Sequence, residues 1–177
     1  LYVVQRHHPD GPRPPVPVWG PAGTAERMAR AYDLPADPGM REEFDFATHD
    51  AQVELGPFLV EPVAVEHPVP AFGFRVSADG RTLGYSGDTG PCAGLDAIAG
   101  GADLLLAEAS FSGRRTNPAG LHLTGADCGA AATRGASRRL LLTHVPAWGD
   151  PQAALEEARS AYDGPVELAR SGGVHEV

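Results

Sequence analysis

Four predicted strands end in polar side chains that the strands themselves do not need. "VAVEH" ends at His67, "LGYSGD" at Asp88, "LLLAE" at Glu108 and "LLLTH" at His144. Because strand ends in layered α/β folds converge on one rim of the sheet, we expect these side chains to lie close together. Imidazole nitrogen and carboxylate oxygen both suit divalent zinc, manganese or iron. The pattern therefore predicts part of a metal site formed by His67, Asp88 and His144.

Asp88 lies in "SGDTG", a glycine-flanked turn that directly follows a predicted strand. An Asp in such a turn is commonly a turn residue whose side chain bonds its own backbone. A carboxylate can also lie between two cations, which is how two-metal hydrolases clamp a phosphoryl group. The turn alone leaves both interpretations open.

The other polar residues also have structural explanations. A histidine at a strand end is commonly a satisfied structural residue, and Glu108 could cap the turn that follows it. His122, in "GLHLTGAD", precedes a predicted helix that Thr124 would cap. It either helps to order that helix start or donates a proton near the rim, since histidine titrates near neutral pH. From spacing alone, both roles remain open.

The elements that must position these residues change in type along the chain. The first forty residues are rich in proline, and we expect only a short strand over 16–20 and a helix over 22–32, capped by Gly23 or Thr24. Further strands are predicted over 43–48, 58–67, 72–78 and 82–86. The Asp-Gly pair in "SADGRT" indicates a tight hairpin between the last two strands.

After Asp88, helices alternate with apolar strands. Helices are predicted over 93–101, 124–136 and 150–162, and strands over 102–110, 138–144 and 166–177. The last helix has Asp150 as its N-cap and Pro151 at its first position. Strands that are apolar throughout indicate a buried sheet with helices on an outer face. The predicted fold class is therefore mixed α/β.

Composition limits the class of protein. The chain has 177 residues, enough for a single domain over 1–177, and 42% of them are hydrophobic. The net charge is −9 and all 14 basic residues are arginine, so the basic surface of a protein that grips a long nucleic acid is missing. Cys92 and Cys128 form no disulfide framework or zinc knuckle by spacing, which predicts a reducing compartment. No apolar run reaches the roughly 18 residues of a membrane span and no leader is recognisable, so we expect a cytoplasmic protein without membrane contact.

Five motifs, in this order along the chain, resemble the metallo-β-lactamase superfamily on its ribonuclease Z-like branch. They are "VEHPVPAFGFRV", "LGYSGDTG", "ADLLLAEASF", "LHLTGADCGAAA" and "LLLTHVPAW". The resemblance covers nearly the whole chain and is closest to short cytosolic cyclic-nucleotide phosphodiesterases. It implies a four-layer αββα sandwich with the site at one edge between two sheets. It also implies two divalent metal ions, zinc or manganese.

The resemblance implies a role for each matching residue. His67 corresponds to a histidine ligand of the first metal, Asp88 to the carboxylate that bridges both metals, and His144 to a ligand of the second. His122 matches the histidine of an "HxT" loop, which contacts the scissile phosphate and assists proton transfer. Glu108 matches an acid that supports such a histidine. The expected catalytic residues are thus His122, Asp88 and Glu108.

One family motif is missing from the sequence. The HxHxDH loop, which supplies two ligands to each metal, is expected a little before Leu1. "RHHPDG" resembles it superficially, but Arg6 replaces the first histidine and Gly11 the last, so a proline-rich loop is the preferred interpretation. Without this loop and the N-terminal strands, each ion would be under-coordinated. We therefore expect the native protein to be longer; the alternative is an inactive or dimer-completed form.

The segment between His67 and Asp88 bears on the substrate. It holds one tight hairpin, whereas tRNA-processing members of the family carry a long inserted arm there. The expected function is hydrolysis of a small phosphodiester, such as a 3′,5′-cyclic nucleotide, by a metal-bridged hydroxide. A tRNA 3′-end endoribonuclease is the alternative, although nucleic acid is the less favoured partner, and an inactive metal-free binding protein is a second alternative. The resemblance also suggests a homodimer.

Overall fold

The computed structural model describes residues 2–11, 13–49 and 52–177. Contacts within the chain divide it into two compact units, Leu1–Asp50 and Ala51–Val177. A single domain over 1–177 stays a prediction. None of the helices in the described ranges has the length and apolar character that a bilayer span requires.

The first unit is built around two parallel strands. β1 (Val16–Gly20) pairs with β2 (Phe44–Thr48), and α2 (Thr24–Ala31) lies between them in sequence. Gly23 is the N-cap of α2 and has a left-handed φ of 86°, which favours the first of the two predicted caps. The short helix α1 (Tyr2–Arg6) was not expected in the proline-rich segment. It is tied to the rest of the unit by an ion pair between Arg6 and the buried Glu43, with 2.9 Å between Nη1 and Oε1.

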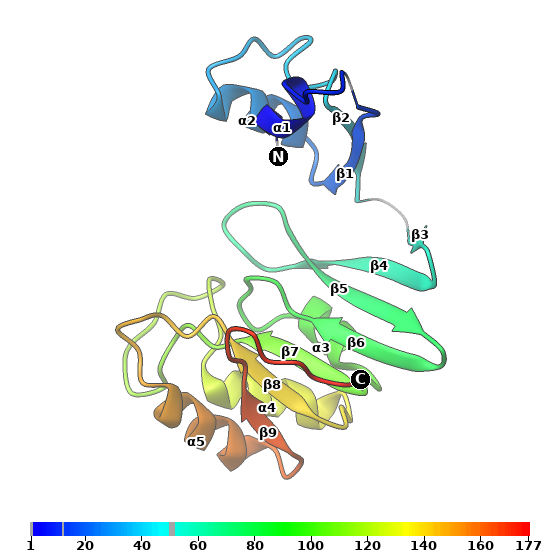
Figure 1. The fold of residues 1–177 in the computed structure, drawn as a ribbon. Helices are drawn as coiled ribbons and strands as arrows, with labels where there is room; N and C mark the ends of the chain where they lie inside the picture. Colours follow the sequence, from blue (N-terminus) through cyan, green and yellow to red (C-terminus); the bar gives the residue numbers. More distant parts are fainter. Residues whose placement is uncertain (1, 12, 50–51) are drawn as a thin grey trace. The chain divides into compact units, whose positions relative to one another are not determined.

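The second unit is a seven-stranded sheet whose strand order follows the sequence (Figure 1). Its strands are β3 (Val53–Leu55), β4 (Phe58–Val65), β5 (Ala71–Ala78), β6 (Arg81–Tyr85), β7 (Leu104–Glu108), β8 (Leu140–Thr143) and β9 (Val166–Leu168). The strands from β3 to β6 are antiparallel, and those from β6 to β9 are parallel. Only β3 was not predicted, and the strand expected over 166–177 is limited to β9.

The hairpin predicted from "SADGRT" is confirmed. Its two turn residues, Asp79 and Gly80, have φ values of 50° and 74°. These positive values are typical of the tight turns that match the twist of antiparallel strands. The hairpin joins β5 to β6 in register, with Ala78 opposite Arg81.

Three helices connect the parallel strands, as predicted. They are α3 (Ala93–Ala99), α4 (Gly125–Arg134) and α5 (Pro151–Ala161). α3 packs over β4 to β6, α4 over β7 and β8, and α5 against α4 and β9. Leu105 and Leu142 of the sheet share one apolar core with Ile98 of α3, Ala131 of α4 and Ala158 of α5. Because this core fixes β6, β7 and β8 side by side, it also fixes where their carboxyl ends lie.

The predicted caps of two helices are confirmed. The Thr124 side chain accepts a hydrogen bond from the backbone N–H of Asp127, whose carboxylate accepts one from the N–H of Thr124, so the two form a capping box. Asp150 accepts hydrogen bonds from the N–H groups of Gln152 and Ala153 at the start of α5. Both helix starts lie directly after segments that carry candidate site residues, so the caps hold those segments in place.

Candidate metal centre

Three of the predicted site residues follow adjacent parallel strands. Asp88 follows β6, Glu108 is the last residue of β7 and His144 follows β8. Gly87, just before Asp88, has a φ of 61°, and a Cβ there would lie 2.5 Å from the carbonyl oxygen of Phe72. Only glycine fits this turn, which directs Asp88 away from the strand. His144 itself has a φ of 57°, an uncommon value for a residue with a side chain.

The structure brings Asp88, His122 and His144 into one group. One possible ligand atom from each lies within 4.8 Å of the other two. The Nδ1 atom of His144 is 3.2 Å from Oδ1 of Asp88. The ring centroid of His122 is 5.6 Å from that of His144 and also 5.6 Å from that of His67. His67 therefore stands beside the group rather than in it, whereas His122, which was not among the expected metal ligands, belongs to it.

Each of these three histidines has a partner at its Nδ1 atom. Nδ1 of His67 is 2.9 Å from the carbonyl oxygen of Leu121, which can only accept, so this nitrogen carries the proton. Nδ1 of His122 is 2.6 Å from Oε1 of Glu108, and Nδ1 of His144 is 3.1 Å from Oγ of Ser110. A carbonyl or carboxylate at one ring nitrogen is the usual support of a metal-binding histidine, because it fixes the tautomer and the ring. Within the described residues the Nε2 atoms of these histidines have no hydrogen-bond partner, so they are available to a metal or a substrate.

Glu108 connects several parts of the site. Only 1% of this residue is exposed, and its carboxylate has three donors around it. Oε1 accepts from the N–H of Thr89, at 3.1 Å, and from His122. Oε2 accepts from the N–H of Ser110, at 3.0 Å. Glu108 thus holds the turn after Asp88, fixes the turn that follows Glu108 itself and orients His122. The sequence left two roles open for Glu108, capping of a turn and support of a histidine, and the residue has both.

His122 occupies a loop whose geometry is set by its neighbours in the chain. Leu123 is fully buried and Thr124 caps α4 through the capping box. The ring of Phe111 meets the His122 ring edge-on, with 5.1 Å between the centroids. The histidine therefore precedes a helix start, as one interpretation expected, and also lies beside Asp88 and His144, where a proton donor near the rim would stand.

The local electrostatics favour a cation. Burial raises the pKa of Tyr85, and the negative charges of Asp88 and Glu108 raise it further. A phenol in this field stays protonated, and a divalent cation would be attracted by the same carboxylates. Burial likewise raises the pKa of Cys128 well above its ordinary value. This thiol therefore stays neutral and acts as part of the buried core.

The donor set fits a divalent metal ion. Asp88 and His144 offer a carboxylate and an imidazole, His122 lies within the same group, and the Nε2 atom of His67 is available nearby. Nitrogen and carboxylate oxygen are the ligands of zinc and manganese sites in proteins. Of the three predicted metal ligands, Asp88 and His144 thus lie in direct contact. The ring of His67 lies next to that of His122.

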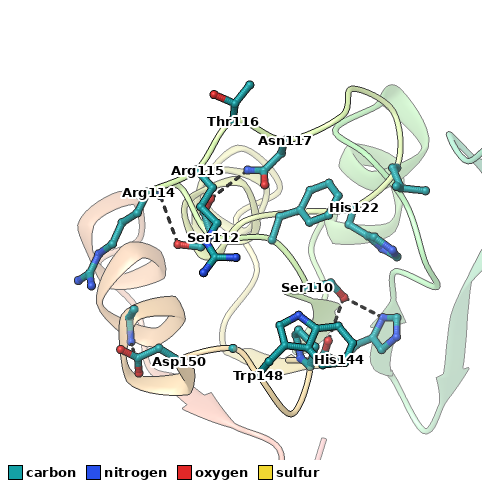
Figure 2. A pocket seen from close by; sticks show the side chains of 15 residues that line it. Ser110, Ser112, Arg114, Arg115, Thr116, Asn117, His122, His144, Trp148 and Asp150 are labelled. Atoms are coloured by element: carbon teal, nitrogen blue, oxygen red, sulfur yellow. Dashed lines mark hydrogen bonds between the residues drawn. The ribbon is translucent and has the colours of Figure 1, made fainter.

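A cavity of about 900 Å³ opens beside the group (Figure 2). It lies between the loop from Ser110 to His122 and the segment from His144 to Asp150. Sequence reasoning missed two of its lining residues, Arg115 and Trp148. The available signals were the adjacent arginines in "SGRRTN" and a tryptophan four residues after a candidate ligand.

A model of the β-lactamase superfamily domain matches residues 3–145 of the chain. The chain belongs to this family. An uncharacterized protein of Mycobacterium leprae is 36% identical over 183 residues, which cover 100% of this chain and 64% of that protein. A ribonuclease Z of Mycolicibacterium paratuberculosis is 32% identical, over 87% of this chain and 64% of its own length. The chain thus spans less than two thirds of these superfamily relatives.

A solved structure shows the same fold. The metallo-β-lactamase fold protein YhfI of Bacillus subtilis superimposes with a TM-score of 0.74, at 24% identity, over 88% of this chain and 62% of that one. The mixed α/β class and the metallo-β-lactamase fold expected from the five motifs are therefore confirmed. The superfamily match ends at residue 145, directly after His144, so it includes every predicted site residue.

Proposed function

We propose that the protein is a metal-dependent phosphodiesterase of the β-lactamase superfamily that hydrolyses a small phosphodiester, such as a 3′,5′-cyclic nucleotide. The observation that carries this proposal is the grouping of Asp88, His122 and His144, with Glu108 bonded to His122. In this arrangement, a site that can bind a cation through Asp88 lies next to the imidazole of His122, which Glu108 holds in a fixed orientation. Membership of a superfamily with relatives named probable metallo-hydrolase and ribonuclease Z supports hydrolysis as the reaction.

The metal ligands in this proposal are His67, Asp88 and His144, which would hold two divalent ions, zinc or manganese, together with further ligands. Such ions, when bound, polarise a phosphoryl oxygen and make water acidic enough to ionise near neutral pH. Asp88 has a side chain that is about half exposed, at 46%, so it can reach the substrate side of the site. Its turn, held by Gly87 and Glu108, keeps the carboxylate in that position.

His122 supplies the proton in the same proposal. Water releases a proton to the solvent and adds to phosphorus as hydroxide, the bond from phosphorus to the departing oxygen breaks, and that oxygen takes a proton from Nε2 of His122. Glu108, 2.6 Å from Nδ1, stabilises the protonated ring and keeps Nε2 pointing toward the substrate. A residue in this role must lie close to the metal ligands without being needed for metal binding.

Hydrolysis of cyclic AMP by the intact protein, with added Mn²⁺ or Zn²⁺, tests the proposal. We expect turnover that stops with a chelator, and a large loss of kcat in His122→Asn with the metal content retained. Equal loss of metal in His122→Asn and Asp88→Asn would instead make His122 a ligand. A metal-loaded protein that hydrolyses neither cyclic AMP nor any other small phosphodiester would overturn the proposal.

A tRNA 3′-end endoribonuclease is the second candidate, because two ribonuclease Z relatives are 32% identical over 87% of this chain and 41% identical over 52% of it. The short β5–β6 hairpin and the net charge of −9 are less suited to a long RNA. Cleavage of a precursor tRNA, with binding that weakens steeply with salt and no hydrolysis of small phosphodiesters, would favour this function. A chain that binds no metal and cleaves neither substrate would point to an inactive binding protein.

A further inference from the structure

We propose that Arg115 and Trp148 form a second binding site within the cavity, and that it holds a further phosphate and a nucleobase of the substrate. We call this pair the distal subsite. The inference rests on the proposed function and narrows its substrate class. Within small phosphodiesters, it favours a dinucleotide that carries a terminal phosphate over a mononucleotide with a single phosphate.

The cavity is larger than the reacting group requires. Its volume of about 900 Å³ lies near the upper end of the range of roughly 300–1,000 Å³ for small-molecule sites. His122 and His144 line it on the side of the metal centre, and Asp150 and Ala153 line it at the start of α5. A substrate that reacts at the histidines therefore has room to extend toward α5.

Two arginines line this space, and of these Arg115 is the one without an acidic neighbour. Figure 2 shows its side chain directed between the loop and the segment that carries Trp148, and Arg114 also lines the cavity. Arg114 has an acidic neighbour, Glu156, at 3.8 Å. Within the described residues, Arg115 forms no ion pair with a carboxylate. In a chain of net charge −9, a guanidinium left without an acid in a cavity is suited to an anionic part of a ligand.

The loop that carries Arg115 is anchored from α5. Oε1 of Glu157 accepts a hydrogen bond from the N–H of Gly113 at 3.0 Å, and Oγ of Ser112 lies 3.4 Å from the same atom. The side-chain amide of Asn117 donates to the carbonyl oxygen of Ser112 at 3.0 Å, which closes the loop on itself. The position of Arg115 is therefore supported by the helix that borders the far end of the cavity.

Trp148 gives the distal subsite an aromatic surface. It is 84% exposed although it lines the cavity, and it sits at the tip of a turn in which the N–H of Gly149 donates to the carbonyl oxygen of Pro146 at 2.7 Å. An indole exposed to this extent is little covered by the described residues, and its face is free to stack on a planar ring. Stacking of a base on an aromatic side chain stabilises nucleotide binding without regard to the identity of the base.

The distal subsite is a binding device and takes no part in bond breaking. The reacting phosphodiester lies at the metal centre, the adjoining base on Trp148, and the terminal phosphate at Arg115. A 3′,5′-cyclic mononucleotide can use Trp148 but has no second phosphate for Arg115. A 5′-phosphorylated dinucleotide such as pApA can use both.

The test compares pApA with ApA, which differ only by the terminal phosphate. With the intact, metal-loaded protein we expect kcat/KM to be about 10- to 100-fold higher for pApA, the range of one charge-assisted hydrogen-bond contact. In Arg115→Gln this ratio is expected to fall toward 1. Arg114→Gln removes the same charge from the neighbouring position and is expected to change the ratio less than about threefold. A ratio near 1 in the unchanged protein, or an equal fall in both variants, overturns the role of Arg115.

A binding measurement separates this inference from the proposed function. Trp148 is one of two tryptophans, so Trp19→Phe leaves it as the sole indole reporter. We expect quenching of its fluorescence by a methylenephosphonate analogue of pApA, which cannot be hydrolysed, and weaker binding when Arg115→Gln is added. Quenching without hydrolysis of any phosphodiester would refute the proposed function and leave the distal subsite standing. Hydrolysis without quenching, or a change in fluorescence that follows protein concentration alone, would refute the subsite and indicate an exposed or self-associating Trp148.

Discussion

The metal centre and the distal subsite border the same cavity but are built in different ways. The centre uses Asp88, Glu108 and His144, which stand at or just beyond the ends of strands fixed by a buried core, and the carboxylate of Glu108 is fully buried. The distal subsite uses Arg115 and Trp148, which are exposed and lie on loops. Chemistry requires side chains held within fractions of an ångström, whereas recognition tolerates adjustment. The comparison predicts that changes in the centre lower kcat and that changes near the distal subsite raise KM.

The largest effect is expected from Asp88→Asn. The amide keeps the shape of the side chain but removes the charge that attracts a cation, and metal-assisted charge stabilisation amounts to several kcal/mol. We expect kcat for phosphodiester hydrolysis to fall by roughly 10³-fold or more. Steady-state kinetics at saturating metal check this, with Asp96→Asn, on the exposed side of α3 and paired with Arg134, as the control. A loss of kcat smaller than tenfold would show that Asp88 is not part of the metal centre.

Glu108→Gln should have the next largest effect. The amide has a single acceptor oxygen, so it can keep the hydrogen bond from Thr89 or the one from Ser110, and it no longer stabilises a charged ring at His122. Loss of such support costs about 10- to 100-fold in activity or metal affinity. We expect kcat to fall in this range with KM nearly unchanged, and the alkaline limb of the pH–rate profile, which requires a protonated general acid, to move to lower pH. An unchanged profile with an unchanged kcat would show that Glu108 serves only the turns.

Glu157→Ala tests the other side of the comparison. It removes the acceptor that anchors the backbone at Gly113, so the loop that carries Arg115 is less well fixed. One hydrogen bond contributes about 1 kcal/mol. We expect KM for a 5′-phosphorylated dinucleotide to rise about fivefold with a smaller change in kcat, and the exposed neighbour Glu156→Ala to have little effect. A fall in kcat with KM unchanged would instead couple the loop to the metal centre.

The smallest effect concerns stability rather than activity. The pKa of Asp103 is lowered, first by the N–H of Thr82 and then by Arg81, with Arg138 adding to the effect. Because the folded-state pKa lies below the unfolded one, this carboxylate stabilises the fold above the ordinary carboxyl pKa, and the contribution is lost as the pH falls through the lowered value. Asp103→Asn should therefore lower Tm slightly at neutral pH and not at all at the acid end of that window. Thermal unfolding across pH checks this, and a difference that grows toward acid pH would contradict it.

The sequence predicted the helices and apolar strands of the second unit well because their signals are local. Asp150 and Thr124 cap helices through contacts two or three residues away, and Asp79-Gly80 defines its hairpin within four residues. The unexpected elements, α1 and β3, are short and lack such signals. Their formation depends on packing and on pairing with β4, which propensity does not encode.

The sequence predicted which residues form the site better than it predicted which of them lie next to one another. The positions of Asp88, Glu108 and His144 at strand ends identify them, because adjacent parallel strands bring their carboxyl ends to the same edge of the sheet. The position of His122 depends on the loop between Phe111 and Thr124, whose path is set by Glu108 and by the cap of α4. For the same reason the role of Arg115 was not predicted. Its loop is held by the hydrogen bond between Gly113 and Glu157, which is distant in the sequence, and no local pattern indicates that contact.

Metal content tests the central claim most directly. The intact protein and its Asp88→Asn variant would be dialysed after loading with Zn²⁺ or Mn²⁺ and subjected to elemental analysis. We predict roughly two equivalents of divalent metal in the unchanged protein, as in two-metal hydrolases, and a clear loss in the variant. An unchanged protein that retains no metal, or a folded variant that retains as much as the parent, would contradict a cation site built on Asp88.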